Sequence, residues 1–187
     1  MKSIKLGNRV IDATSSPYII AEIGVNHEGS LAKAKELIEL AKEGGADAAK
    51  FQTYKADTLA SVNSPAYWDR SKEHTGSQHE LFHKYDCFEE KDYVALCKHC
   101  LKVGIDFIST PFDDIAVEFL NPLVPFFKVA SADITNIPFL RKIASKKKPV
   151  LLSTGASNQV EIDLATSELK KYGCKDLCLL HCILNYP

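Results

Sequence analysis

Short apolar runs alternate along the chain with longer segments whose apolar residues recur every three or four positions. The runs predict six β-strands, and the amphipathic segments between them predict five helices. Short connections between strands and helices that alternate in this way favour parallel βαβ units. The predicted strands cover residues 18–25, 47–53, 105–111, 126–131, 149–155 and 177–182, and the predicted helices cover residues 30–45, 89–103, 113–122, 137–146 and 158–173.

Two segments depart from this alternation. The opening stretch SIKLGNRVIDAT predicts a small hairpin that turns at Gly7 and Asn8, and such a hairpin could plug one end of a barrel. Residues 55–86 are polar and have no clear period, so the pattern predicts no element there.

Either an open doubly wound sheet or a (β/α)₈ barrel accommodates the alternating elements. The dinucleotide-binding pattern GxGxxG, which marks many doubly wound sheets, is missing from the sequence. Active sites of barrels lie at the carboxyl ends of the strands, and every predicted strand ends in polar residues. These are Glu22, Lys50 and Gln52, Ser109 and Thr110, Lys128 and Ser131, Ser153 and Thr154, and His181. The pattern favours an α/β fold of the TIM (β/α)₈ barrel type.

Six strands are too few to close an eight-stranded barrel, and no helix is predicted after the last strand. We therefore expect residues 1–187 to form an incomplete barrel of about six βα units, as part of a longer protein.

Composition and charge narrow the function classes. Hydrophobic residues make up 45% of the chain and charged residues 25%, and the net charge is −1, which gives no support to nucleic-acid or membrane binding. The sequence has no apolar segment of transmembrane length and no signal peptide, so the cytoplasm is the expected location. The six cysteines include one CxxC pair, Cys97 and Cys100, without a second pair at zinc-ribbon spacing, so we expect reduced thiols and no metal site among them.

Two lysines at strand ends are the main indication of the chemistry of the site. Lys50 and Lys128 end the second and fourth predicted strands, and a buried ammonium group needs an anionic partner. If both lysines point into one barrel mouth ringed by serine and threonine hydroxyl groups, the mouth suits a phosphate or carboxylate ligand. Glu22, Asp133, His27 and His181 are the candidate acid–base groups, although Glu22 could equally serve only as an ion-pair partner.

Several motifs resemble one known family in order and spacing. The segments IIAEIGVNHEG, AAKFQTYKADTL, ISTPFD, FKVASADITNIPFL, LLSTGAS and LLHCILNYP together resemble the N-terminal barrel of the sialic acid synthase (NeuB-type) family. The resemblance implies a transferase that condenses phosphoenolpyruvate with an N-acetylated hexose, such as N-acetylmannosamine or a bacillosamine-derived relative. The expected products are a nine-carbon sugar acid and phosphate.

The resemblance also implies partners that the sequence motifs alone do not show. Family members use Mn²⁺ or Mg²⁺ to activate the sugar aldehyde, and their metal-binding histidines would lie beyond Pro187, so no metal ligand is assigned here. An antifreeze-like domain follows the barrel in the family and reaches across a domain-swapped homodimer. The last strands and that domain would then lie outside this sequence.

Site residues follow from the same resemblance. Glu22, Asp133 and Lys128 are the expected catalytic residues, and Asp133 replaces the glutamate that the family commonly has. Ser77 and Gln78 would belong to a loop that closes over the substrate. Phosphoenolpyruvate would be held by Lys50, Thr110, Lys128, Ser131 and Ser153, and the sugar by Gln52, Asp133, Asn185 and Tyr186.

Two other functions remain open from the sequence. A desolvated lysine such as Lys128 is also the nucleophile expected of a Schiff-base aldolase. A chain of this length could alternatively be an inactive fragment or a binding module.

Overall fold

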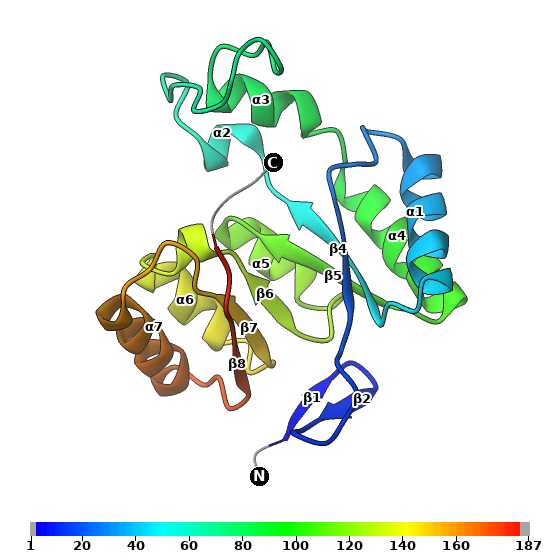
Figure 1. Ribbon diagram of the computed structural model, residues 1–187, viewed down its shortest axis with the longest axis vertical. Coiled ribbons are helices and arrows are strands. Elements are labelled where there is room, and N and C mark those ends of the chain that lie inside the picture. The colour runs from blue at the N-terminus through cyan, green and yellow to red at the C-terminus, as the bar shows by residue number, and fades with distance from the viewer. Residues whose placement is uncertain (1–2, 184–187) are drawn as a thin grey trace.

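The computed structural model describes residues 3–183, which form an α/β fold built on two parallel sheets (Figure 1). Each sheet has three strands, and in both sheets the spatial order of the strands follows the order of the chain. The first sheet contains β3 (Ile20–Gly24), β4 (Ala48–Thr53) and β5 (Asp106–Pro111), and the second contains β6 (Phe127–Val129), β7 (Val150–Ser153) and β8 (Leu177–Leu180).

Helices follow the strands and cover one side of the sheets (Figure 1). Their N-termini are set by side chains that satisfy free backbone amides: the Ser30 and Asn158 side chains both accept hydrogen bonds from the first turn that follows them. The five main helices are α1 (Leu31–Glu43), α4 (Glu90–Val103), α5 (Asp114–Leu120), α6 (Ile137–Ala144) and α7 (Gln159–Lys171).

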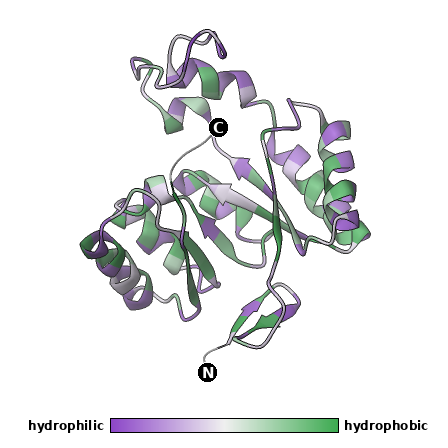
Figure 2. Cartoon of the chain, viewed as in Figure 1, coloured by the Kyte–Doolittle hydropathy of each residue, from purple (hydrophilic) through white to green (hydrophobic). Residues whose placement is uncertain are grey.

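Two hydrophobic clusters lie on opposite faces of the sheets, one on the outer face and one on the inner face. The larger cluster joins the helices to alternate strand residues such as Phe51, Phe107 and Leu152. The smaller cluster contains Ala48, Ile108, Phe126 and Leu151, and none of its described members lies in a helix. One face therefore packs against helices and the other face packs on itself, which is the organisation of a barrel. In Figure 2, strands β7 and β8 are coloured mainly as hydrophobic, whereas the carboxyl ends of β4 and β5 are hydrophilic or neutral.

The sequential strand order decides between the two architectures. A doubly wound sheet reverses its strand order at a switch point and carries helices on both faces. Both sheets here keep the chain order, and β5 lies beside β6 without a hydrogen-bonded ladder between them among the described residues. The arrangement is TIM-barrel-like, as the sequence predicted.

The predicted hairpin forms at the amino ends of the strands. Strands β1 (Ile4–Leu6) and β2 (Arg9–Ile11) pair antiparallel, and buried Leu6 belongs to the inner cluster. The Arg9 guanidinium holds both carboxylate oxygens of Asp47 at 2.7 Å. The hairpin thus closes the lower end of the inner face.

A helical excursion projects from the opposite end of the strands (Figure 1). It contains α2 (Ala56–Leu59) and α3 (Gln78–Tyr85), within the polar segment for which no element was predicted. Lys55 at its start and Asp86 at its end are joined by a 2.8 Å ion pair, and Asp86 also accepts a hydrogen bond from the Ala56 amide. This neck holds the two ends of the excursion together.

The predicted strand over residues 126–131 is too long. Strand β6 ends at Val129, and Ser131–Asp133 form a 3₁₀ turn. The other five strands lie inside their predicted ranges. No helix in the described part of the chain is long and apolar enough to cross a membrane.

Candidate functional site

A polar ring lines the inner face above the smaller hydrophobic cluster. Side chains alternate between the two faces of a strand, so residues two positions beyond the inner apolar residues also point inward. This alternation carries the inner face from Ala48 to Lys50 on β4, and from Phe126 to Lys128 on β6. The remaining inward positions at this level are Glu22 on β3, Gln52 on β4, Thr110 on β5 and Ser153 on β7.

Glu22 and Lys50 form the central ion pair of the ring. They are register partners across β3 and β4, and the Lys50 ammonium contacts the Glu22 carboxylate directly. The Lys50 side chain is 10% exposed and the Glu22 side chain 53% exposed. The Lys50 side chain is therefore buried, whereas the Glu22 side chain that contacts it remains accessible to solvent.

Lys128 shares the ring with Lys50. Burial, followed by the charge of Lys50, lowers the pKa of Lys128 to about 8, while the charge of Glu22 opposes this change. The Lys128 ammonium donates a hydrogen bond to the Val129 carbonyl at 2.8 Å. The two predicted lysines therefore act on each other electrostatically from the same face.

Asp133 stands above β6 in the 3₁₀ turn. Its Oδ2 atom is buried and makes no hydrogen bond within residues 3–183. Burial raises the pKa of Asp133 to about 6, and the nearby charge of Lys128 only partly offsets this increase. The carboxyl group can therefore exchange a proton near neutral pH.

The hydroxyl groups divide between the two faces. Thr110 and Ser153 are buried on the inner face, as predicted, and Ser131 opens the 3₁₀ turn. Ser109, which the sequence placed in the same rim, points to the outer face, where its hydroxyl lies 2.7 Å from that of Thr53. The expectation for Ser109 is wrong because adjacent strand residues cannot share a face.

Tyr93 supports the ring from behind. Its hydroxyl donates a hydrogen bond to the Gln52 carbonyl at 2.8 Å from the outer side, where α4 packs. The sequence pattern does not reveal this residue, since a tyrosine on the buried side of a helix carries no signal beyond core packing. Gly24 was missed too, although a glycine directly after a strand marks a position with special backbone geometry; its φ is +53°.

The histidines are not gathered at the ring. His27 is buried and stacks on Phe88 with ring centroids 4.1 Å apart. Its Nδ1 accepts a hydrogen bond from the Gly29 amide, and burial lowers its pKa, so it packs as a neutral ring. His181 is exposed directly after β8.

The predicted loop residues have local partners. Ser77 caps α3 by accepting a hydrogen bond from the Glu80 amide, and Gln78 donates one to the Pro65 carbonyl. Both stay predictions as substrate contacts, and both belong to the excursion at the carboxyl ends of the strands. Asn185 and Tyr186 lie outside the described residues.

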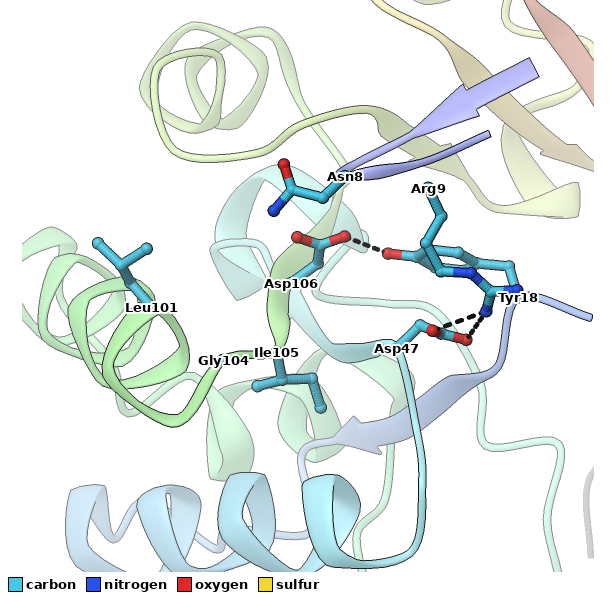
Figure 3. A pocket seen from close by; sticks show the side chains of 8 residues that line it. All are labelled: Asn8, Arg9, Tyr18, Asp47, Leu101, Gly104, Ile105 and Asp106. Atoms are coloured by element: carbon cyan, nitrogen blue, oxygen red, sulfur yellow. Dashed lines mark hydrogen bonds and ion pairs between the residues drawn. The ribbon is translucent and has the colours of Figure 1, made fainter. Parts of the chain in front are cut away.

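A separate pocket, with a volume of about 270 Å³, lies at the amino ends of the strands. Figure 3 shows the side chains that line it. Its charged groups satisfy one another: Arg9 pairs with Asp47, and the Tyr18 hydroxyl donates to the Asp106 carboxylate. Barrel enzymes place their catalytic groups at the other end of the strands. This pocket is therefore part of the hairpin attachment.

Metal binding finds no support in the described residues. Between residues 3 and 183, no three His, Cys, Asp or Glu side chains are grouped closely enough to hold a metal ion. Residues 3–183 therefore contain no complete set of ligands for the metal that the family resemblance implies.

Comparison with known proteins identifies the family. The family model described as "NeuB family" matches residues 37–187. The chain is 43% identical to the N,N'-diacetyllegionaminic acid synthase of Legionella pneumophila, over 91% of this chain and 49% of that protein. It is 37% identical to the human N-acetylneuraminate-9-phosphate synthase, over 91% of this chain and 47% of that protein.

Solved structures support the same conclusion. The sialic acid synthetase of Leptospira borgpetersenii, crystallised in complex with citrate, has a TM-score of 0.86 and 34% identity, covering 100% of this chain and 61% of that one. A truncated 3-deoxy-D-arabino-heptulosonate 7-phosphate synthase from Thermotoga maritima shares the fold with a TM-score of 0.68 at 18% identity. The chain spans about half the length of the curated relatives it matches. This chain belongs to the NeuB family.

Proposed function

We propose that this chain carries the phosphoenolpyruvate-binding part of a sugar-acid synthase. The full enzyme condenses phosphoenolpyruvate with an N-acetylated hexose, gives a nine-carbon sialic-acid-like sugar and releases phosphate. The observation that carries the proposal is the pair of inward lysines, Lys50 and Lys128, on one face. Two ammonium groups at the carboxyl ends of parallel strands suit a ligand with both a phosphate and a carboxylate.

The relatives support this assignment. Their names describe synthases of N,N'-diacetyllegionaminic, N-acetylneuraminic and pseudaminic acids, and the Leptospira protein was crystallised with citrate, a small acid with several carboxylates. We propose the same chemical class for this chain and leave the acceptor as an N-acetylated amino sugar.

Each ring residue takes a role in the proposed reaction. Lys50, Lys128, Thr110, Ser131 and Ser153 hold the phosphate and carboxylate of phosphoenolpyruvate, and Gln52 contacts the sugar. The methylene carbon of phosphoenolpyruvate bonds to the aldehyde carbon, and Asp133 delivers a proton to the aldehyde oxygen, as its raised pKa allows. Water then adds at the second carbon of the former phosphoenolpyruvate and returns one proton to the Asp133 carboxylate. The carbon–oxygen bond to phosphate breaks as the new hydroxyl group loses its proton to the departing phosphate, which leaves a ketone.

We further propose that residues 1–187 are the N-terminal part of the barrel domain. Strands β5 and β6 lie side by side although they share no hydrogen-bonded ladder, so among the described residues the row of six strands ends at β3 and β8, which offer two edges to which further βα units can attach. The divalent metal, the antifreeze-like domain and the homodimer belong to this same proposal for the full-length protein.

Binding of phosphoenolpyruvate tests the proposal directly. Titration calorimetry should show binding to the unchanged chain, and Lys50→Met and Lys128→Met should each weaken it at least about tenfold because a desolvated charge partner is lost. Lys98→Met, on the exposed side of α4, is the matched control and should leave the affinity unchanged. If the unchanged chain and all three variants bind phosphoenolpyruvate with equal affinity, Lys50 and Lys128 do not form the anion site.

The lowered pKa of Lys128 favours one alternative, a Schiff-base aldolase. Its amine would attack a ketone carbonyl, lose water and form an imine. Borohydride treatment with pyruvate should then add a reduced adduct to Lys128, detectable by peptide mass spectrometry. If no adduct forms while phosphoenolpyruvate still binds, Lys128 acts through its charge and the synthase assignment stands.

A further inference from the structure

We propose that in the ligand-free chain the Glu22 carboxylate contacts Lys50 at the position that an anionic ligand would take. Binding of the ligand would displace the Glu22 carboxylate, and release of the ligand would restore the contact. This inference rests on the proposed function, because it concerns the same lysine pair.

Unequal burial of the two partners supports an exchange. Lys50 is held among buried strand residues, while the side chain of Glu22 remains half exposed although it contacts the Lys50 ammonium. If the contact breaks, the glutamate can turn into water at little cost, whereas the buried lysine needs another anion in its place. The pair is therefore asymmetric, with a fixed cation and a replaceable anion.

The backbone at Gly24 makes room for the carboxylate. The β3–β4 register slips between Glu22 and Gly24. A methyl group added at Gly24 would lie 3.2 Å from Glu22 Oε1 and 3.7 Å from Gln52 Nε2. The Glu22 carboxylate thus lies beside Gly24 and near the Gln52 amide while it contacts the Lys50 ammonium, and it occupies a contact that an anionic ligand of Lys50 would need.

The charge of the ring also favours replacement by a stronger anion. Lys50 lowers the pKa of Lys128, and the carboxylates of Glu22 and Asp133 only partly oppose that change, so the two ammonium groups still repel each other. The Lys128 ammonium is hydrogen-bonded to a carbonyl and forms no ion pair in the described part of the chain. A phosphate group with two negative charges can contact both lysines and displace the single charge of Glu22.

Once displaced, Glu22 is a free carboxylate beside the bound ligand. Until a substrate binds, the Lys50 ammonium would neutralise the charge of the Glu22 carboxylate. After the exchange, the free carboxylate could act as a base or contact the sugar. In the ligand-free chain, the same contact keeps Lys50 charged and in position.

The exchange predicts that removing the competitor strengthens anion binding. Inorganic phosphate and phosphoenolpyruvate are titrated separately into the unchanged chain, Glu22→Gln and Glu22→Asp at pH 7 and low ionic strength. Glu22→Gln should bind each anion about fivefold more tightly, the size of the contribution of a partly exposed ion pair. Glu22→Asp keeps the charge but shortens the reach by one methylene, so it should fall between the two.

Glu28→Gln is the matched control. Glu28 lies in the loop that follows β3 and forms an ion pair with Lys33 at 2.9 Å instead of with Lys50, so its loss should not change anion affinity. Thermal unfolding of each variant checks that the fold is kept, and Glu22→Asp serves if Glu22→Gln does not fold.

The possible results separate this inference from the proposed function. If the unchanged chain binds anions and both Glu22 variants bind equally or more weakly, Glu22 is not a competitor and the exchange is overturned, while the synthase proposal stands. If neither the unchanged chain nor any variant binds phosphate or phosphoenolpyruvate, the anion site itself is wrong and both proposals fail.

Discussion

At the scale of single residues, the ring places ionisable groups in surroundings that disfavour their charged forms. Lys128 is the clearest example, because burial and Lys50 both oppose its ionisation. Such a group lowers the stability of the folded chain, a cost that is typical of functional sites. Its stability cost can be measured separately from its role in binding.

We predict that Lys128→Met stabilises the ligand-free chain at pH 7. The folded pKa, about 8, lies below the ordinary value of 10.5, so between these values the unfolded chain binds more protons and stability rises with pH. Below pH 8 the penalty is fully present, and its removal should raise the free energy of unfolding by about 2 kcal/mol. Urea unfolding at pH 7 and pH 10 measures the gain, which should shrink at the higher pH. A gain of the same size at both values would point to packing instead.

Asp133 should show the opposite pH dependence. Its folded pKa of about 6 lies above the ordinary 3.8, so the folded chain binds more protons between these values and loses stability as pH rises through 6. Asp133→Asn should therefore raise the free energy of unfolding above pH 6 by about 1 to 2 kcal/mol and leave it unchanged at pH 4. The control is Asp163→Asn on the exposed side of α7, for which we expect no pH-dependent gain.

At the scale of elements, the hairpin β1–β2 depends on one close approach. Gly7 has a φ of +54°, and an added methyl group would overlap the Asp106 carboxylate, which also accepts the Tyr18 hydrogen bond. Only glycine combines this backbone conformation with the missing side chain.

Gly7→Ala should therefore detach the hairpin. We expect the free energy of unfolding to fall by about 2 kcal/mol and limited proteolysis to cut within residues 3–14 first. Gly104→Ala is a matched control, because Gly104 also has a positive φ, +78°, but no atom within 4 Å of an added methyl group. It should cost only the backbone strain, about 1 kcal/mol. Equal effects of the two variants would show that the Asp106 contact contributes nothing.

The elements also show which parts of the fold the sequence could predict. Strands and helices with a regular apolar period were found, and the inward direction of Lys50 and Lys128 follows from counting in steps of two from Ala48 and Phe126. The turn at Ser131–Asp133 and the helices α2 and α3 were not predicted, because short elements depend on local hydrogen bonds and tertiary contacts more than on periodicity. The ion pair between Glu22 and Lys50 depends on strand register, which one strand alone does not reveal.

At the scale of the whole molecule, the two sheets leave apolar surface beside β8. Leu179 is 45% exposed on the outer side of this strand, and Val160 and Leu164 are exposed on α7, which precedes it. Strand β8 also has one unpaired edge among the described residues. Such edges and patches promote association.

We predict that the 187-residue chain associates reversibly as its concentration rises. Leu179→Lys should lower the average mass measured by sedimentation velocity, because a charge on this surface opposes burial. Val62→Lys replaces a similarly exposed residue in the excursion and should leave the association unchanged. A chain that stays monomeric at every concentration would contradict the role assigned to the surface beside β8.

The hairpin beneath the inner cluster affects the route by which a ligand reaches Lys50. Leu6 packs with Ala48 and Ile108 at the amino ends of the strands, so the hairpin covers that end of the inner face, while Asp133 and the excursion lie at the carboxyl ends. In the complete barrel that we propose, a ligand of Lys50 would then enter and leave past Gln52, at the carboxyl ends of the strands. The two proposed substrates would therefore have to bind in a fixed order, with phosphoenolpyruvate entering before the acceptor sugar covers it.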